Sequence, residues 1–219
     1  MKRSTAILFV GLFLSLGVVY AWARLRAEMP WLQTEIVEVS EPPETHLVTP
    51  AMLAATEKMA KLPAPAFDAE ATDGASYRLE DTLGKRPLVL VFIKDGCPCS
   101  RAAEPFFNRL HAAYKDEVQF LGVIDVDMTT AKTWATVNRV PFPVLADPEF
   151  QIIHAYKAES SAYVALVSKD GTIETLWPGY SGSMLTEASE ALARLSGREV
   201  KSINATDGPT VLTTGCSFE

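Results

Sequence analysis

The sequence predicts an α/β fold in which a mixed central sheet is flanked by helices. Residues 88–93, LVLVFI, are continuously apolar, which is typical of a strand covered on both faces in a largely parallel sheet. From residue 62 onward, strand signals alternate with helix signals, as in chains that pack helices against a sheet. Residues 162–168 and 172–178 flank Lys169-Asp170-Gly171, a tight-turn sequence that predicts an antiparallel hairpin at one edge.

The first expected elements are a hairpin, the buried strand and a helix. Residues 66–79 turn at Asp73-Gly74, a pair that tolerates the positive φ of a tight turn. Pro105 lies inside the expected helix and predicts a kink, because proline cannot donate a backbone hydrogen bond. The helix itself is predicted from apolar residues at three- and four-residue spacing, which are Ala102, Ala103, Phe106, Phe107, Leu110, Ala113 and Tyr114.

The second half continues the alternation. Residues 118–127 form another apolar run, expected as a buried strand, and residues 129–140 are expected as a helix that ends before the prolines of PFPVL. After the hairpin at the sheet edge, residues 183–195 predict a final amphipathic helix with Gly197 as its stop. The complete order is hairpin, βαβα, ββα.

Length, composition and charge exclude several classes of protein. A chain of 219 residues with 48% hydrophobic residues can bury a sizeable core. The net charge of −7, without a cluster of Lys and Arg among aromatic residues, excludes nucleic acid as a partner. The sequence contains no glycine-rich phosphate loop and no serine triad, and no cofactor is expected.

Residues 1–26 predict a membrane anchor or an export signal. The uncharged apolar run at residues 6–23 has basic residues on both sides, and its ~18 residues could just span a bilayer as a helix. We therefore expect a single-pass membrane protein with its domain on the exported side, periplasmic or extracellular. The alternative is secretion after cleavage near Ala23, which ends a small-residue pattern. No cysteine accompanies the run, so an N-terminal lipid anchor is not expected.

The rest of the chain divides into three parts. We expect residues 27–61 to be a linker with a short helix, residues 62–197 to be the folded domain, and residues 198–219 to be a tail. His46 lies in the linker and is expected to be a solvated residue without a chemical role. The other histidines, His111 and His154, fall within helical patterns and are expected on helix surfaces rather than as ligands.

The chemistry concentrates in KDGCPCS, residues 94–100. Cys97 lies between a buried strand and a helix opened by Pro98, and therefore at a helix N-terminus. Free N–H groups and the helix dipole favour the thiolate there, which makes Cys97 the expected nucleophile, although the carboxylate of Asp95 opposes that effect. Two inert buried cysteines are the alternative, but such cysteines usually lie within strand or helix patterns.

Several ordered motifs give the chain a resemblance to known redox proteins. The run LPAPAFDAEATDGASYRLEDTLGKRPLVLVF, the cysteines, FLGVIDVD and VPFPVLADPEFQIIHAY follow one another in that order. Together they resemble the redoxin (AhpC/TSA-like) branch of the thioredoxin superfamily, which includes peroxiredoxins and membrane-tethered thiol-disulfide oxidoreductases. The resemblance covers about residues 62–195 and implies a thioredoxin-like fold.

The resemblance also implies roles for the cysteines. Tethered reductases of this branch carry Cys-x-x-Cys, with a proline eight residues after the first cysteine, and Pro105 has that spacing from Cys97. The match therefore places Cys97 on the attacking cysteine. Ser100 stands where the second cysteine belongs, and Cys99 sits one position early. A helix turns by about 100° per residue, so Cys99 cannot replace that partner without local rearrangement.

Two thiols are therefore candidates to resolve Cys97. A bond between Cys97 and Cys99 needs a restricted backbone and would be strained and easily reduced. Cys216 is the second candidate, because its tail of about 20 residues is long enough to fold back across the domain. The alternatives for Cys216 are no role, or a bond between two chains.

Other activities of the branch match this sequence less well. Peroxidases carry Pro-x-x-x-Thr/Ser-x-x-Cys and a later arginine, and this chain lacks the proline, the hydroxyl and the arginine at those positions. Copper-delivery members use Cys-x-x-x-Cys and a histidine in the loop before the strand at residues 162–168, where this chain has Ser160-Ser161. Reductases place a cis-proline beside the client groove at the position of Ala162.

The sequence thus favours an exported thiol-disulfide oxidoreductase. We expect Cys97 to attack a partner's disulfide, and Cys99 or Cys216 to resolve the mixed disulfide. The expected partners are protein thiol or disulfide clients and a membrane or periplasmic thiol reductant. A peroxiredoxin-like antioxidant peroxidase is the first alternative, since thiolates react with peroxide. A non-enzymatic carrier of copper is the second, since thiolates are soft ligands for Cu(I).

Overall fold

The computed structural model describes residues 46–218, which belong to one compact unit. The helices of this part are α2 (Pro50–Met59), α3 (Leu79–Thr82), α4 (Pro98–Tyr114), α5 (Met128–Val137), α6 (Gln151–Ala155) and α7 (Gly182–Ser196). The strands are β1 (Asp68–Glu70), β2 (Ser76–Arg78), β3 (Leu88–Ile93), β4 (Gln119–Ile124), β5 (Val144–Ala146), β6 (Val164–Val167) and β7 (Ile173–Trp177).

A five-stranded mixed sheet forms the centre of the fold, in the order β5-β4-β3-β6-β7. The strands β3, β4 and β5 are parallel, whereas β6 and β7 add an antiparallel edge. The predicted hairpins are both present: β1 pairs with β2 around Gly74, and β6 pairs with β7 around Gly171, and both glycines have positive φ. The expected α/β class with a thioredoxin-like sheet is confirmed.

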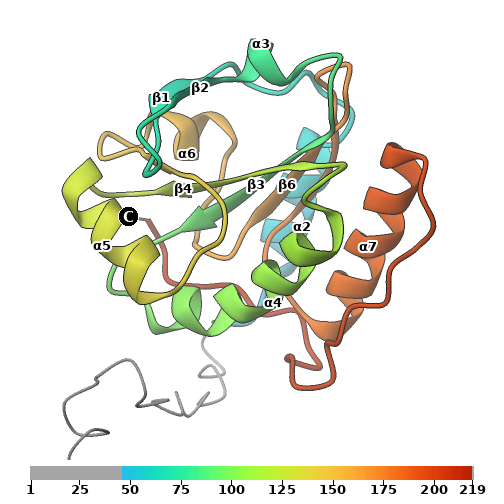
Figure 1. Cartoon of the computed structure of the whole chain (residues 1–219). Helices are drawn as coiled ribbons and strands as arrows, with labels where there is room; N and C mark the ends of the chain where they lie inside the picture. The colour runs from blue at the N-terminus through green and yellow to red at the C-terminus, as the bar shows by residue number, and fades with distance from the viewer. Residues whose placement is uncertain (1–45, 219) are drawn as a thin grey trace, which may run out of the picture. The chain divides into compact units, whose positions relative to one another are not determined.

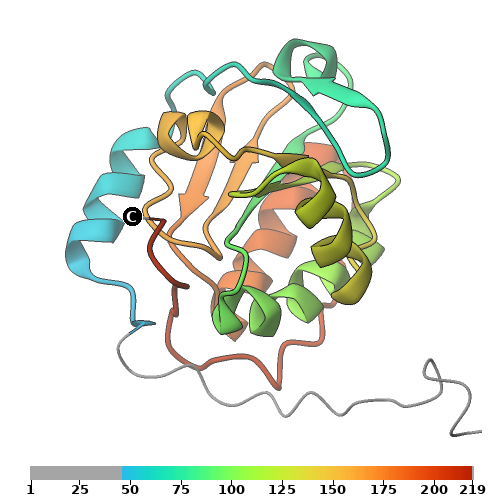
Figure 2. The same cartoon turned by 90° about the vertical axis from the view of Figure 1, so that its left-hand side faces the viewer.

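Helices cover both faces of the sheet. The side chains of β3 alternate between the two faces and are buried in a separate cluster on each. Its residues Val89, Val91 and Ile93 pack with α4, α5 and α7, whereas Leu88 and Phe92 pack with α2 and α6 on the other face. Figure 1 shows the sheet between these layers, and Figure 2 shows α2 and α7 on opposite sides of it. The uninterrupted apolar sequence of β3 is therefore explained by burial on both faces.

The helix α4 carries the site. It begins directly after Cys97, continues through Pro105 and ends at Tyr114. The Tyr114 hydroxyl donates to the carbonyl of Ser189 on α7 and accepts the N–H of Lys201, at 2.9 Å each. These bonds tie the C-terminal end of α4 to α7 and to the tail, while its N-terminus follows the short loop after β3.

The folded unit extends beyond the boundaries expected at residues 62 and 197. Met59 of α2 is buried in the core, and the N–H of Lys61 donates to the carbonyl of Ile173 on β7 at 2.7 Å. Residues 46–61 are therefore part of the compact unit rather than a free linker. Beyond Gly197, which ends α7 with φ 68° as predicted, the tail runs back over the domain (Figure 1).

Some elements differ from the prediction. The helices α3 and α6 and the strand β5 were not anticipated, because each is only three to five residues long. The strand predicted at residues 118–127 is shorter, since Asp127 instead begins α5. Its carboxylate accepts the N–H groups of Thr129 and Thr130, at 2.8 and 3.1 Å, as an N-cap.

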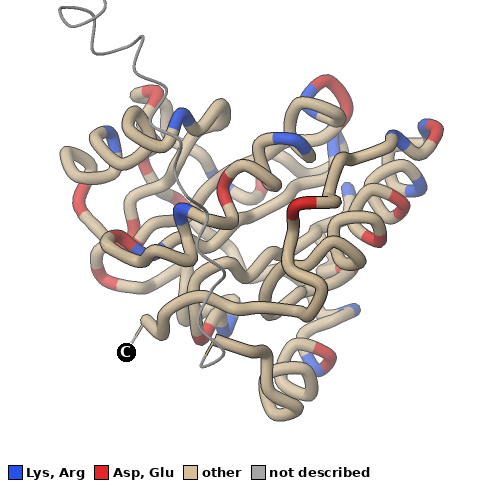
Figure 3. Tube along the Cα trace, turned by 90° about the horizontal axis from the view of Figure 1, so that it is seen from below, with Lys and Arg blue, Asp and Glu red and all other residues tan. Residues whose placement is uncertain are grey.

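Two further expectations concern the membrane and nucleic acid. Within residues 46–218, no helix is both long enough and apolar enough to cross a membrane. The anchor or signal predicted at residues 1–26 lies outside the described residues and stays a prediction. In Figure 3, basic and acidic residues are interspersed along the trace, and the expectation that nucleic acid is not a partner stays a prediction.

Candidate functional site

Cys97 occupies the N-cap of α4, at the end of a loop that hydrogen bonds hold in place. Its φ of −81° and ψ of 120° are extended, and Pro98 follows in the first helical turn. The N–H of Asp95 donates to the Asp125 carboxylate at 2.8 Å, and the N–H of Lys94 donates to the Ser100 hydroxyl at 3.1 Å. Ser100, where related reductases have a cysteine, therefore stabilises the loop, and the sulfur of Cys97 lies where the helix favours a thiolate.

A disulfide joins Cys97 to Cys216 of the tail. Their Cα atoms are 6.0 Å apart, across 119 residues of sequence. The Cys97 sulfur also accepts the N–H of Cys216 at 3.2 Å and the hydroxyl of Ser161 at 3.5 Å. Cys99 remains a free, buried thiol. Of the two partners left open by the sequence, the structure thus pairs Cys97 with the distant one.

The tail reaches Cys97 because it pairs with two other segments on its way. Thr213 exchanges backbone hydrogen bonds with Tyr180, at 2.8 and 2.9 Å. Further along, Ser161 donates its N–H to Cys216 at 3.0 Å and accepts the N–H of Gly215 at 2.8 Å. The last described residue, Phe218, donates its N–H to Glu159 at 3.1 Å. Residues 215–218 therefore lie antiparallel to the loop before β6, with Cys216 opposite Cys97.

Two glycines permit this close approach. A Cβ on Gly215 would overlap the Ser161 hydroxyl and lie 2.9 Å from its carbonyl oxygen. A Cβ on Gly179 would similarly overlap the carbonyl of Thr213. Because real Cβ atoms do not approach backbone this closely, the pairing of the tail depends on glycine at both positions.

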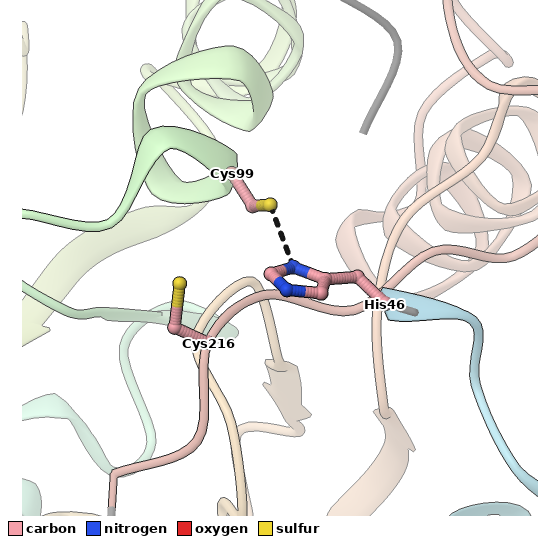
Figure 4. Close-up of side chains that lie close together, drawn as sticks. All are labelled: His46, Cys99 and Cys216. Atoms are coloured by element: carbon pink, nitrogen blue, oxygen red, sulfur yellow. Dashed lines mark hydrogen bonds between the residues drawn. The ribbon is translucent and has the colours of Figure 1, made fainter. Parts of the chain in front are cut away.

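His46 lies at the site, contrary to the expectation of a solvated linker residue. Its Nδ1 is 2.9 Å from the sulfur of Cys99, and its carbonyl accepts the N–H of Thr214 at 2.8 Å. Figure 4 shows the His46 ring pointing toward Cys99, with Cys216 nearby. Neither motif spacing nor periodicity could place His46 here, because the tail brings it to the site by backbone pairing.

Cys99 is shielded from solvent. Its side chain is 2% exposed, and burial raises the pKa of its thiol. The pKa of Tyr180 is raised to about 12, first by burial and then by the negative charge that Cys99 would carry. The donor atoms of His46, Cys99 and Cys216 all lie within 4.8 Å of one another, close enough for one metal ion.

The remaining histidines, His111 and His154, do not belong to this group of donor residues. His154 is exposed on α6 and stacks on Phe150, as expected for a surface residue. His111 is half-buried on α4 between Phe120 and Phe142, and burial lowers its pKa. His111 is therefore a packing residue rather than a freely solvated one.

Ala162 stands where related reductases carry a cis-proline, and its backbone is unusual. It has φ 64°, a left-handed conformation that is rare outside glycine, and no peptide bond within residues 46–218 is cis. Its N–H donates to the carbonyl of Phe92 on β3 at 2.8 Å, which fixes the turn. The backbone groups of residues 159–161 that β3 does not use face the tail, which forms hydrogen bonds with them.

Comparisons with known proteins identify a matching family and several similar solved structures. Residues 60–176 match the model of the AhpC/TSA family. No curated protein matches the chain. Among solved structures, a secreted Mycobacterium tuberculosis disulfide oxidoreductase homologous to E. coli DsbE is 26% identical, with a TM-score of 0.51 over 59% of this chain and 96% of that chain.

Two further structures are similar. DsbF from MTB, in mixed oxidised and reduced forms, is 28% identical, with a TM-score of 0.50 over 57% of this chain and 94% of that chain. Peroxidoxin BcpB from Mycobacterium tuberculosis is 18% identical, with a TM-score of 0.52 over 66% of this chain and 99% of that chain, and this likeness shows the fold alone. The chain therefore belongs to the AhpC/TSA family, in the redoxin branch of the thioredoxin superfamily, and these likenesses support an oxidoreductase activity.

Proposed function

We propose that the chain is a thiol-disulfide oxidoreductase of the cell envelope that exchanges disulfides with protein clients through Cys97, with Cys216 as the resolving thiol. The observation that carries this proposal is the bond between a cysteine at a helix N-cap and a cysteine on a paired but terminal segment. The second cysteine of this bond belongs to no helix or strand of the sheet, which favours opening of the bond without loss of the sheet.

The exchange has two steps. In the reduced protein, the Cys97 thiolate attacks one sulfur of a client disulfide, and the other client sulfur leaves as a thiolate that takes up a proton. Cys216 then loses its proton and attacks the Cys97 sulfur, which releases the second client thiol and forms the Cys97–Cys216 bond. Two electrons pass from the protein dithiol to the client disulfide, so a dithiol reductant must reset the protein.

The same structure supports a docking mode for the client. In the oxidised protein, the tail lies antiparallel to residues 159–161 and presents Cys216 to Cys97. A client segment in extended conformation could form the same backbone hydrogen bonds once the tail has moved aside. The overlap that a Cβ on Gly215 would cause favours clients with glycine before the reactive cysteine.

The location rests on the N-terminal sequence. Residues 1–26 would hold the domain on the outer side of a membrane, or would be removed by cleavage near Ala23. Residues 27–45 would then connect the anchor to the compact unit. Extraction of membranes with alkaline carbonate, followed by N-terminal sequencing, separates these outcomes: an anchored chain stays in the pellet with Met1 intact.

Disulfide turnover of variants tests the proposal. Cys97→Ser should abolish reduction of a disulfide-bonded peptide, and Cys216→Ser should accumulate the mixed disulfide at Cys97, visible by mass spectrometry. Cys99→Ser should still form the Cys97–Cys216 bond on oxidation. Unchanged turnover in Cys97→Ser would refute the proposal. Accumulation of the mixed disulfide in Cys99→Ser, rather than in Cys216→Ser, would assign resolution to Cys99 instead.

A further inference from the structure

We propose that the reduced protein binds one thiophilic d10 ion, Cu(I) or Zn(II), through Nδ1 of His46 and the sulfurs of Cys99 and Cys216. Figure 4 shows these three side chains converging from the N-terminal segment, α4 and the tail. The site is distinct from the Cys97 nucleophile, although it shares Cys216 with the disulfide.

The distances suit such an ion. Metal bonds of about 2.0 Å to imidazole nitrogen and about 2.3 Å to thiolate sulfur place the donor atoms of one site about 3.5 to 4 Å apart. The three donor atoms lie within 4.8 Å of one another, and His46 Nδ1 is 2.9 Å from Cys99 Sγ. Adjustments of roughly 1 Å, within the reach of side-chain rotation, would bring all three to bonding distance.

The donor residues are positioned by backbone contacts that do not involve a metal. The carbonyl of His46 accepts the N–H of Thr214, and the carbonyl of Cys216 accepts the N–H of Ser161. Cys99 is held in the first turn of α4, two residues after the N-cap. Because each donor has its own support, the ion would bind to a largely formed site, and the free energy of binding would not be spent on ordering the chain.

The donor chemistry selects the class of ion. Two thiolates and one imidazole are soft or borderline ligands that prefer Cu(I) and Zn(II), and no carboxylate belongs to the set. Cys99 is buried and has no disulfide partner, so its proton is one of the two that an ion would replace, and the other is that of Cys216. With only three protein donors, Cu(I) would fill a three-coordinate site, whereas Zn(II) would keep an open position.

Oxidation and metal binding compete for one sulfur. In the oxidised protein, the Cys216 sulfur is bonded to Cys97 and is not a thiolate. A dithiol reductant delivers two electrons and two protons to that bond, and the ion then displaces the protons of Cys99 and Cys216 into solvent. The site is therefore available only after reduction, and a bound ion would protect Cys216 from reoxidation.

Two of the three donor residues lie outside the family match. The matched range, residues 60–176, contains Cys99 but neither His46 nor Cys216. The proposal therefore concerns the segments that this chain adds on either side of the matched range.

Metal titration of the full chain tests the proposal. Protein reduced with a phosphine is titrated with Cu(I) or Zn(II) against a chromophoric chelator, and one ion per chain is expected. His46→Ala and Cys99→Ser should each weaken binding by about 10-fold or more, as loss of a ligand or its support does in other sites. Cys97→Ser should bind within about threefold of the wild type, because Cys97 is not a donor. His154→Ala is the matched control, since His154 is exposed and is not one of the donor residues.

The outcomes separate this site from the proposed exchange activity. X-ray absorption should show one nitrogen and two sulfur ligands, and the ion with the tighter binding identifies the metal. Equal binding by oxidised and reduced wild type, loss of binding in Cys97→Ser, or wild-type binding in His46→Ala would each overturn the assignment. Circular dichroism and urea unfolding of His46→Ala distinguish loss of a ligand from loss of the fold. Cys97→Ser lacks the nucleophile, so metal binding in this variant is measured independently of exchange.

Discussion

Glu104 lies in the middle of α4 and is the most deeply buried acidic residue in the described part of the chain. Its side chain is 2% exposed, and neither carboxylate oxygen has a hydrogen-bond partner within residues 46–218. Burial raises its pKa from 4.5 to about 8. Replacing Glu104 by glutamine keeps the shape of the side chain and removes the titration.

The sign of the pH dependence follows from the raised pKa. Between pH 4.5 and about 8, the folded protein holds one proton that the unfolded chain has released, so the free energy of unfolding falls as pH rises. This contribution is fully present below pH 4.5 and is lost by about pH 8. A shift of this size corresponds to an upper limit of roughly 5 kcal/mol, at about 1.4 kcal/mol for each pH unit.

Urea unfolding from pH 4.5 to pH 9 measures the effect. Wild type and Glu104→Gln should have similar stability at the acidic end, and the variant should gain several kcal/mol relative to wild type by pH 8.5. Glu190→Gln is the control, because Glu190 is exposed on α7, and its curve should run parallel to that of the wild type. If Glu104→Gln also runs parallel to the wild type over this range, the carboxyl is ionised at neutral pH and the reasoning from burial is wrong.

Three further changes test the tail and the packing of the sheet. Cys216→Ser should lower the stability of the oxidised protein by about 5 kcal/mol, because the disulfide closes a loop of 119 residues, and reduced wild type should unfold like the variant in urea. Gly215→Ala should slow reformation of the Cys97–Cys216 bond after reduction, measured by quenched alkylation, since its Cβ would lie 2.9 Å from the Ser161 carbonyl oxygen; Ser202→Ala in the exposed tail should not. Asp147→Asn should cost about 1 to 3 kcal/mol in thermal unfolding, because its buried carboxylate accepts three N–H groups that begin α6, whereas Glu149→Gln on the surface should cost little.

Sequence reasoning could predict most of the sheet because its signals are local. The apolar run of β3, the turn at Gly171 and the stop at Gly197 each lie within a few residues of the structure they specify. The N-cap position of Cys97 was predictable for the same reason, since Pro98 marks the start of a helix.

The rest of the site depends on pairings between segments far apart in the sequence. The bond between Cys97 and Cys216 spans 119 residues, and the contact between His46 and Cys99 spans 53. Both require the tail to pair with residues 159–161 and with the segment before α2, and such pairing leaves no periodic pattern in a few residues of irregular chain. The close approaches at Gly179 and Gly215 are the signals that remain in the sequence, but a glycine alone does not identify its neighbour.

Because Cys216 lies on the tail rather than in α4, the proposed exchange would require the tail to move before a client can bind. In a Cys-x-x-Cys helix the second thiol stays beside the first, whereas here the edge at residues 159–161 is covered whenever Cys216 is in place. In the proposed exchange, a client and the tail would therefore compete for one edge. If residues 215–218 detached, the pairing of Thr213 with Tyr180 would hold the tail nearby and keep the local concentration of Cys216 high. In the proposed exchange, Cys216 would then resolve the mixed disulfide soon after Cys97 has attacked the client.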